Sequence, residues 1–366
     1  MSRKKIEKKK ILFILKQREL HNDIDDYSAG LEYSSGQILT TGLLNSASYV
    51  SEMLDETFGF SSKLVVVVDN NDIDREVALY KPTHVIIEAL WVVPEKLEVL
   101  KALHPTVEWI IRVHSEIPFI ASEGVSFNWL YRYLLIDNVY VAVNSRRMEK
   151  DMEFYFQLFD DISQKKMREK VLYLPNYYPT TFNEKDINKN KTHIDIACFG
   201  AIRPLKNHLI QAMAAVMFTE KIGKKLRFHI NVTRVEQRGE SILRNLESLF
   251  NSLASKGHVL VKHDWYDKET FLQICRQMDI GMQVSLSETF NLVTADLISQ
   301  GVPMVTSSEI DWIDKKSFAD TTDSRDIAST LYNIYNDSDA NAEQNKKFLR
   351  RFSRRAKQIW IDYLTE

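Results

Sequence analysis

The sequence predicts an α/β protein of two domains, each with a parallel sheet covered by helices. The first observation is that short, uniformly apolar segments alternate with helical segments, which is typical of parallel strands buried on both faces. The second is that the alternation stops at a polar, proline-containing linker and then restarts. The third is the length of 366 residues, which corresponds to two domains of roughly 150 residues.

The composition is that of an ordinary globular protein. Hydrophobic residues make up 44% and charged residues 27%, and the net charge of −2 produces no global attraction to nucleic acid or membrane. Cys198 and Cys275 lie in apolar segments, so we expect buried free thiols in a reducing compartment. No apolar run reaches the ~18 residues of a membrane span. We therefore expect a cytoplasmic protein without stable membrane insertion.

The first half of the chain contains six apolar runs that predict strands. They are residues 11–15, 64–68, 84–87, 109–113, 139–143 and 171–174. Helices are predicted at 43–57, 72–80 and 94–103. Residues 16–41 form a long polar loop, and such loops in compact domains are usually functional or mobile.

Two positions in this half are candidates for ligand contacts. Gly42 precedes a predicted helix, and a glycine loop between a strand and a helix presents free amides to a phosphate or sugar, although a lone glycine also fits an ordinary loop. His114 follows the strand at 109–113. Ligands in parallel sheets bind beyond the carboxyl ends of strands, so His114 is either a ligand contact or a structural hydrogen-bonding residue.

The linker at residues 175–191 contains two prolines and a polar run, and it predicts the domain boundary. In the second half, strands are predicted at 194–199, 226–231, 259–263, 280–284 and 302–306. Helices are predicted at 207–221, 241–253, 268–277, 292–300 and 341–364. The basic residues of the last helix are interpreted as a solvated face; they are Arg350, Arg351, Arg354, Arg355 and Lys357.

The stretch 285–305 organises the second half. It is predicted to run from a strand end through a polar loop into a helix that Ser287 caps and Gly301 ends, and Pro303 opens the next strand. Glu288 and Asp296 flank the helix start. Carboxylates beside free helix amides suit a ligand with hydroxyls and phosphate, whereas the alternative is a solvated loop with a capping acid.

Two further segments of the second half complete a possible ligand site. Arg203 and Lys206 stand before a predicted helix start, and two cations there fit a diphosphate. Asp264 follows a strand within an aromatic segment that could stack on a base. If the two halves face each other, these segments and His114 would line a cleft between the carboxyl ends of two sheets.

In this chain order, the sequence resembles the retaining GT-B glycosyltransferases, and among them family 4. The most specific part is Ser287-Glu288-Thr289-Phe290 through Asp296 to Gly301-Val302-Pro303. The family has a second glutamate where this chain has Asp296. The resemblance implies that Glu288 holds the hydroxyls of the donor sugar and that Asp296 faces the ribose. It places the backbone of three residues beside sugar and phosphate: Phe290, Asn291 and Leu292.

Other segments extend the resemblance over nearly the whole chain. The stretch from Gly200 to Lys206 is similar to the family loop whose arginine and lysine grip the diphosphate, here Arg203 and Lys206 at a short interval. His114 matches the family histidine near the reacting sugar. Gly42 matches the glycine loop of the first domain, although the family's tandem glycine pair is absent. The helix with Trp360 resembles the one that crosses back to the first domain.

The implied fold is GT-B, with two Rossmann-like doubly wound domains facing a central cleft. The predicted domains are an acceptor domain at residues 1–177, a donor domain at 178–345 and a returning helix at 346–366. The implied activity is transfer of a sugar, with retention of configuration, from a nucleotide diphosphate sugar such as a UDP-sugar. The resemblance implies no metal or other cofactor.

The acceptor is less constrained than the donor. Residues 69–76 and 86–91 are similar to glycosyltransferases of tailed bacteriophages, which implies a hydroxymethylated pyrimidine in duplex phage DNA and action in the host cytoplasm. Such an enzyme must extract the base from the duplex and needs basic side chains, for which Arg146, Arg147, Lys150 and residues 165–170 are candidates. Alternative acceptors are a cell-surface glycan or a lipid carrier. A non-catalytic module that binds nucleotide sugar or nucleic acid is the other class.

Overall fold

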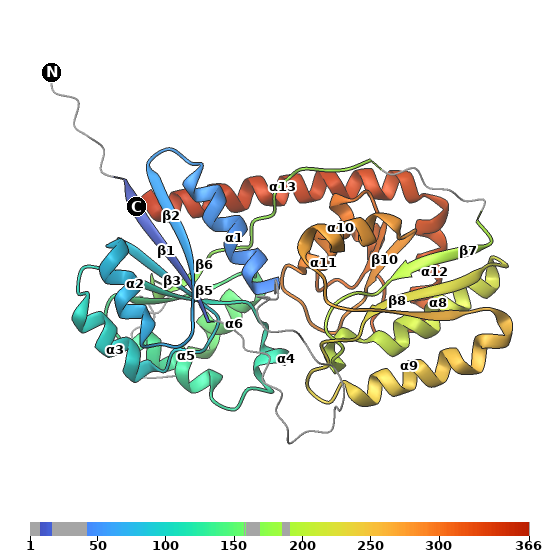
Figure 1. Ribbon diagram of the computed structural model, residues 1–366, viewed down its shortest axis with the longest axis horizontal. Helices are drawn as coiled ribbons and strands as arrows, with labels where there is room; N and C mark the ends of the chain where they lie inside the picture. Colours follow the sequence, from blue (N-terminus) through green and yellow to red (C-terminus); the bar gives the residue numbers. More distant parts are fainter. Residues whose placement is uncertain (1–7, 17–41, 157, 159–168, 185–190, 366) are drawn as a thin grey trace. The chain divides into compact units, whose positions relative to one another are not determined.

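A computed structural model describes residues 8–16, 42–156, 158, 169–184 and 191–365 (Figure 1). Of the predicted loop at 16–41 and the predicted basic cluster at 165–170, residues 17–41 and 165–168 lie outside this description, whereas Lys170 is described and donates to the carbonyls of Leu134 and Ile136. Contacts group the chain into two compact units. The first unit comprises Met1–His114, Glu123–Leu174 and Trp360–Glu366, and the second comprises Ser115–Ser122 and Pro175–Ile359. The predicted domain limits at 177/178 and 345/346 remain a prediction.

The first unit contains a six-stranded sheet in the order β2-β1-β3-β4-β5-β6, and every neighbouring pair is parallel. Its strands are β1 (Lys9–Lys16), β2 (Phe60–Val67), β3 (His84–Glu88), β4 (Glu108–Val113), β5 (Val139–Val143) and β6 (Val171–Tyr173). The chain adds β2 on one side of β1 and β3 on the other. The direction of winding therefore reverses between β1 and β3, and ligands of such sheets bind at this switch point.

Six helices of the first part of the chain are described. They are α1 (Gly42–Asp55), α2 (Asp72–Tyr80), α3 (Pro94–Leu103), α4 (Ile117–Ile120), α5 (Ser126–Leu135) and α6 (Arg146–Phe156). Gly42 was predicted to precede the helix, but it is the first residue of α1. Helix α5, for which no bounds were predicted, buries Leu130, Tyr133 and Leu134 at helical spacing.

The second unit contains a five-stranded parallel sheet in the order β11-β10-β7-β8-β9. Its strands are β7 (His193–Ala197), β8 (Lys225–Asn231), β9 (Val259–His263), β10 (Ile280–Gln283) and β11 (Met304–Thr306). The chain adds β8 and β9 on one side of β7 and β10 on the other. The switch point of this sheet therefore lies between β7 and β10.

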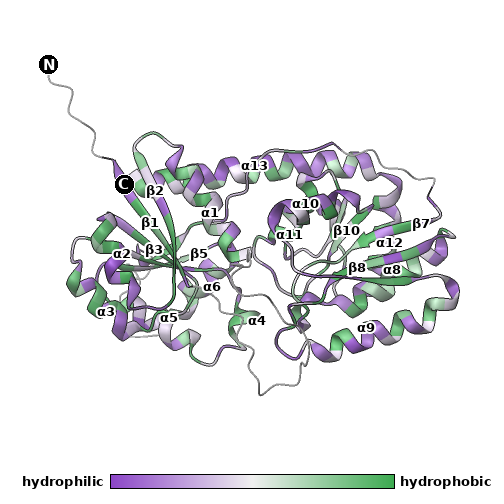
Figure 2. Ribbon diagram, viewed as in Figure 1, coloured by the Kyte–Doolittle hydropathy of each residue, from purple (hydrophilic) through white to green (hydrophobic). Residues whose placement is uncertain are grey.

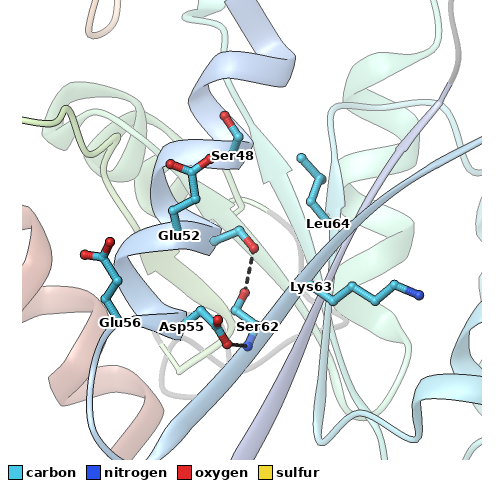
Figure 3. A pocket seen from close by; sticks show the side chains of 8 residues that line it. Ser48, Glu52, Asp55, Glu56, Ser62, Lys63 and Leu64 are labelled. Carbon is cyan, nitrogen blue, oxygen red and sulfur yellow. Dashed lines mark hydrogen bonds between the residues drawn. The ribbon is translucent and has the colours of Figure 1, made fainter.

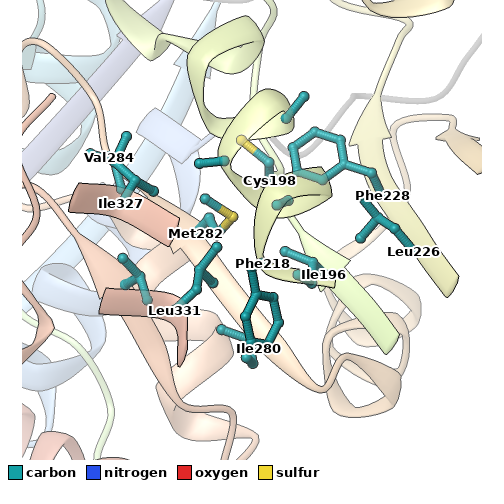
Figure 4. Packing of buried hydrophobic residues seen from close by; sticks show 14 of the residues in the cluster. Ile196, Cys198, Phe218, Leu226, Phe228, Ile280, Met282, Val284, Ile327 and Leu331 are labelled. Carbon is teal, nitrogen blue, oxygen red and sulfur yellow. The ribbon is translucent and has the colours of Figure 1, made fainter. Parts of the chain in front are cut away.

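Helices cover both faces of this second sheet. They are α8 (His208–Lys221), α9 (Glu240–Leu253), α10 (Lys268–Gln277), α11 (Leu292–Ser299) and α12 (Ser324–Asn336), with single 3-10 turns at η1 (Pro204–Lys206), η2 (Ala254–Lys256) and η3 (Lys315–Ser317). One core layer joins the strands to α8, α9 and α12 (Figure 4). Alternate strand residues such as Ile196, Phe228 and Met282 meet Phe218 of α8 in this layer. Polar and apolar residues alternate along α9, as expected for an amphipathic helix that packs on the sheet with one face (Figure 2).

On the other face, Gly281 lets α11 pack closely against the sheet. A Cβ atom at Gly281 would lie 2.4 Å from Met304 Sδ and 2.8 Å from Leu297 Cδ1, closer than such atoms approach. Because the start of α11 is where the sequence places the donor loop, this close packing fixes the position of that loop on the sheet.

Two details of the 285–305 stretch differ from the prediction. The N-cap of α11 is Asn291, whose side chain accepts a hydrogen bond from the amide of Thr294, and not Ser287. Asn291 adopts a left-handed conformation with φ 58°, which asparagine tolerates better than most residues. The last strand begins at Met304, because Pro303 has no amide to donate to a neighbouring strand.

The terminal helix α13 (Ser338–Thr365) is longer than predicted. Its residues up to Ile359 belong to the second unit and its end belongs to the first, where Trp360 is fully buried with its ring 6.1 Å from that of Phe13. Within the described part of the chain, no helix is long and apolar enough to cross a membrane. Cys198 and Cys275 are buried free thiols, as predicted, and burial raises the pKa of Cys198 to about 12.

Candidate functional site

The two loops that leave the switch point of the second sheet meet through an ion pair. Lys206, at the end of the loop after β7, places Nζ 2.5 Å from Oε1 of Glu288, which lies in the loop after β10. A backbone hydrogen bond from Leu286 N to Leu205 O, 2.8 Å long, ties the loops together beside the pair. The structure thus brings together two residues that the sequence nominated from segments 82 positions apart.

Gly200 shapes the first of these loops. Its φ of 118° is open to glycine and strained for other residues, and a Cβ there would lie 3.8 Å from Cε of Lys206. Its amide donates to Asn231 Oδ1 over 3.0 Å, and Asn231 Nδ2 donates to the carbonyl of Asp264 over 3.1 Å. A single asparagine at the end of β8 therefore connects the loop of Gly200 to the segment of Asp264.

A polar ladder also holds the start of α11. Asn291 Nδ2 donates to Gln283 Oε1 over 2.9 Å, and Gln283 Nε2 donates to the carbonyl of Phe199 over 2.9 Å. The first amides of a helix have no partner within that helix and carry partial positive charge. Those of α11, beginning at Leu292, follow Glu288 closely in the chain. The site therefore combines a lysine, a carboxylate and helix-start amides.

The side chain of Phe290 holds the loop after β10 in place. It is 1% exposed, and its ring stacks on Trp312 and on Phe352, with centroid distances of 5.2 and 5.0 Å. Its carbonyl accepts a hydrogen bond of 2.7 Å from Trp312 Nε1. The side chain is thus committed to packing, so that only the backbone of this residue is available to a ligand, as the resemblance implies.

Asp296 lies apart from the Lys206–Glu288 pair, one turn into α11. It is 5% exposed, and its Oδ1 accepts hydrogen bonds from Tyr178 Oη at 2.8 Å and Lys268 Nζ at 3.2 Å. Burial raises the pKa of Asp296, and Lys268 and Tyr178 offset part of that rise. The carboxylate already has protein partners, so its ribose contact remains a prediction.

Arg203 pairs with Glu236 and not with Glu288. Its Nη1 lies 3.4 Å from Glu236 Oε2, and its guanidinium lies 4.7 Å from the ring centre of Phe119. Its Nε is buried and finds no hydrogen-bond acceptor in the part of the chain that the structure describes. Arg203 is therefore held at the side of the loop, with one buried donor left over.

His114 belongs to a buried charge cluster of the first unit, which we call the Glu88 cluster. Its Nε2 lies 2.5 Å from Glu88 Oε2, and Arg112 Nη1 lies 3.0 Å from Glu88 Oε1. Burial and Arg112 lower the pKa of His114, while Glu88 acts in the opposite direction. Burial alone would raise the pKa of Glu88, but Arg112 and His114 outweigh it and the pKa lies below its usual value.

Glu88 and Arg112 were not predicted as site residues, because Glu88 follows the predicted strand at 84–87 and Arg112 is a single charged residue in the apolar run 109–113. Both side chains are fully buried, and the guanidinium of Arg112 lies 5.4 Å from the ring centre of Trp360. Glu88 ends β3, which borders the switch point of the first sheet. The next residue, Ala89, has φ 71°, a strained conformation of the kind found at functional sites. The available signal was a charged residue near the carboxyl end of each strand, Glu88 as the last residue of β3 and Arg112 as the second-last of β4.

A shallow pocket of the first unit lies between α1 and β2 (Figure 3). Glu52, Asp55 and Glu56 line it together with Lys63, and burial and Glu56 raise the pKa of Glu52. Three carboxylates would repel a diphosphate, so this pocket has the wrong charge for such a ligand. Separately, the described residues contain no group of His, Cys, Asp and Glu that could hold a metal ion.

Comparisons with known proteins come from structure alone, since no family model and no curated protein matches the chain. HepE of Anabaena, solved with UDP and glucose, matches with a TM-score of 0.63 and 11% identity over 98% of this chain and 99% of its own. The N-terminal domain of a trehalose-6-phosphate phosphatase from Candida albicans matches with a TM-score of 0.67 and 10% identity, over 97% and 96% of the two chains.

TarM of S. aureus, solved as a mutant with UDP, fondaparinux and α-GlcNAc-glycerol, matches with a TM-score of 0.56 and 14% identity. That match covers 76% of this chain and 54% of TarM, so the chain spans about half of that protein. Identities this low speak for the fold alone. With two parallel sheets, each covered by helices, the chain has the GT-B fold with two Rossmann-like halves.

Proposed function

We propose that this protein is a retaining glycosyltransferase that takes a sugar from a nucleotide diphosphate, most simply a UDP-sugar. The observation that carries the proposal is the Lys206–Glu288 pair, which joins the two switch-point loops beside the start of α11. A cation, an acceptor of hydroxyl hydrogen bonds and free helix amides are the groups that a sugar diphosphate requires.

The predicted residues of the second unit each receive a role in donor binding. Lys206, with Arg203 from the side of the loop, binds the diphosphate, and Glu288 turns from Lys206 to the sugar hydroxyls. The backbone from Phe290 to Leu292 lies along sugar and phosphate. Gly200 leaves room for close approach of the phosphate. The segment of Asp264, followed by two aromatic residues, contacts the base, and Asp296 contributes to the ribose contact through its fixed position.

The chemical step depends on stabilising charge on the leaving phosphate. Lys206, Arg203 and the amides at the start of α11 supply this electrostatically, and one such donor is worth ~10²–10³ in rate. Double displacement needs a free carboxylate nucleophile. Glu88 is the carboxylate nearest to His114, but it is already bound by Arg112 and His114. Front-face attack, in which the leaving phosphate receives the acceptor proton, therefore fits better, with His114 at the transferred sugar.

For the acceptor, we propose a hydroxymethylated pyrimidine in phage DNA. The support is the similarity of residues 69–76 and 86–91 to phage glycosyltransferases, and the second segment contains Glu88. One earlier candidate for phosphate contacts is weakened, because Arg146 bonds Glu149 over 2.7 Å and stacks on Tyr173. Transfer to a glycan or lipid carrier is the competing acceptor class. A non-catalytic binding module is the competing function.

The first test is slow hydrolysis of nucleotide sugars by the purified protein across a panel of bases and sugars. We expect hydrolysis of at least one UDP-sugar, and a thermal shift with UDP. Absence of both hydrolysis and a thermal shift with every nucleotide would overturn the proposal that the protein is an enzyme.

The second test supplies duplexes with and without hydroxymethylcytosine. A mass gain of one sugar only on the modified duplex supports the DNA acceptor, whereas transfer to glycan or lipid alone replaces it.

A further inference from the structure

The outer face of α13 carries a stripe of five cations, which we call the α13 stripe. They are Lys347, Arg350, Arg351, Arg354 and Arg355, all exposed. At 3.6 residues per turn they fall within an arc of about 140°, and at 1.5 Å per residue they extend over about 12 Å. The stripe is thus one continuous basic surface of the second unit, although the whole chain has a net charge of −2.

One carboxylate lies beside one end of this surface: a hydrogen bond from Lys346 and the charges of Lys346, Arg350 and Lys347 lower the pKa of Glu343. Between Lys347 and Arg355 the helix carries no acidic residue. In the ranges that the structure describes, none of the five cations forms an ion pair, while neighbouring Lys346 does pair with Glu343. Arg350 and Arg351 lie over the rings of Phe182 and Phe348 at 4.5 and 4.9 Å, which limits their movement without removing their charge. A merely solvated helix face usually mixes both signs of charge, whereas the nine residues from Lys347 to Arg355 include five cations and no acid.

The opposite side of α13 is fully used by the protein itself. Leu349 and Ala356 are buried, and Phe352 packs against Phe290 of the donor loop. An amphipathic helix that binds membranes needs its apolar face free to enter the lipid. The apolar face of α13 is not free, so the stripe is suited to a polyanion that binds by charge alone.

We propose that the α13 stripe binds the phosphate backbone of duplex DNA. Duplex DNA presents one phosphate per ~1.7 Å of axis, so a 12 Å stripe meets several phosphates. Arginine, which supplies four of the five cations, binds phosphate in a bidentate manner. The choice of DNA among polyanions rests on the proposed acceptor. The contact between Phe352 and Phe290 places the DNA-binding helix directly against the donor loop.

The test is the binding of a labelled 30-bp duplex, with and without hydroxymethylcytosine, at a series of salt concentrations. Replacing Arg354 and Arg355 by glutamine together should reduce the slope of log K against log salt by up to ~1.8, at ~0.9 per lost phosphate contact. The same pair changed to lysine should keep most of the slope. Replacing the exposed pair Lys315 and Lys316 of η3 by glutamine is the matched control and should leave binding unchanged.

Two results would overturn the inference. One is a glutamine variant that binds DNA with the wild-type slope. The other is wild-type protein that ignores DNA but binds anionic lipid vesicles or a sulfated polysaccharide through the stripe. Donor hydrolysis is measured in the same samples and should not change in the glutamine variant. Loss of the DNA slope with intact hydrolysis supports the inference, and absent hydrolysis in wild type counts against the proposed function instead.

Discussion

The two units place charged groups at their switch points in different ways. In the first unit, Glu88 and Arg112 are partners in the register of adjacent strands β3 and β4, and both are fully buried. In the second unit, Lys206 and Glu288 stand on loops, and their side chains keep 11% and 7% exposure. One cluster is held by the sheet, and the other is held by two loops that touch.

This difference separates positioning from binding. In the strand-borne cluster, Arg112 and His114 are both bonded to Glu88, and Glu88 thereby orients the ring of His114, whose side chain is 15% exposed. A loop-borne pair can exchange partners, because each charge can turn to a diphosphate or a hydroxyl at little cost to the sheet. We therefore expect changes in the Glu88 cluster to affect stability first, and changes in the Lys206–Glu288 pair to affect activity first.

The largest expected effect on stability is that of Glu88→Ala. It leaves Arg112 buried without its carboxylate, and breaking a buried pair costs about 3–5 kcal/mol. Denaturant unfolding of wild type and variant measures the loss. Glu95→Ala is the control, because Glu95 is mostly exposed in its pair with Arg132, and its loss should leave the free energy of unfolding nearly unchanged. A cost at Glu88 equal to the control would contradict a structural role for the cluster.

Glu288→Ala should behave in the opposite way. It removes the acceptor for donor hydroxyls, and we expect a loss of ~10²–10³ or more in kcat/KM for donor hydrolysis or transfer, while the protein stays folded. Lys206→Met should give a comparable loss by removing the cation at the diphosphate. Steady-state kinetics and a melting curve for each variant check both parts. Retained activity in both variants would move the donor site away from this pair.

The pKa of His208 indicates whether water reaches the region beside Lys206. His208 is the first residue of α8 and is 1% exposed. Its burial, and to a smaller extent the positive charges of Lys206 and Arg203, lower its pKa to about 3. Between pH ~6.5 and about 3, the unfolded chain therefore binds a proton that the folded chain does not, so stability falls as pH falls, by up to ~1.4 kcal/mol per pH unit.

The His208→Gln variant lacks this proton uptake. Unfolding free energies measured from pH 7 down to pH 5 should therefore fall more steeply for wild type than for the variant. Parallel pH profiles would mean that His208 titrates normally, and that the loop of Lys206 is open to water.

The smallest effect concerns the strain beside Glu88. Ala89 has φ 71°, and glycine adopts this conformation without the Cβ clash. Ala89→Gly should stabilise the protein by about 0.5–1 kcal/mol after the entropy cost of glycine is included. Ala78→Gly, on the exposed side of α2, is the control and should destabilise it by about 1 kcal/mol. Destabilisation at both positions would show that Ala89 carries no strain.

Most of the strands could be predicted from the sequence. The limits of β5 and β9 agree with prediction, whereas β2 begins four residues earlier than expected because its first part, at the edge of the sheet, is polar. Helix α12 was missed although its signals were present. Asp323 caps it, and Ile327, Leu331 and Ile334 repeat at helical spacing along its buried side.

The sequence by itself determined the two alternating α/β halves, and it identified the loops after β7 and β10, because apolar periodicity, prolines and glycines are local signals. Only the tertiary structure decided which charges meet. Lys206 and Glu288 are 82 residues apart, Asp296 and Tyr178 are 118 apart, and Glu88 meets Arg112 through strand register. Which residues pair across such separations in the sequence depends on sheet order and helix packing, since no local sequence pattern encodes the pairing.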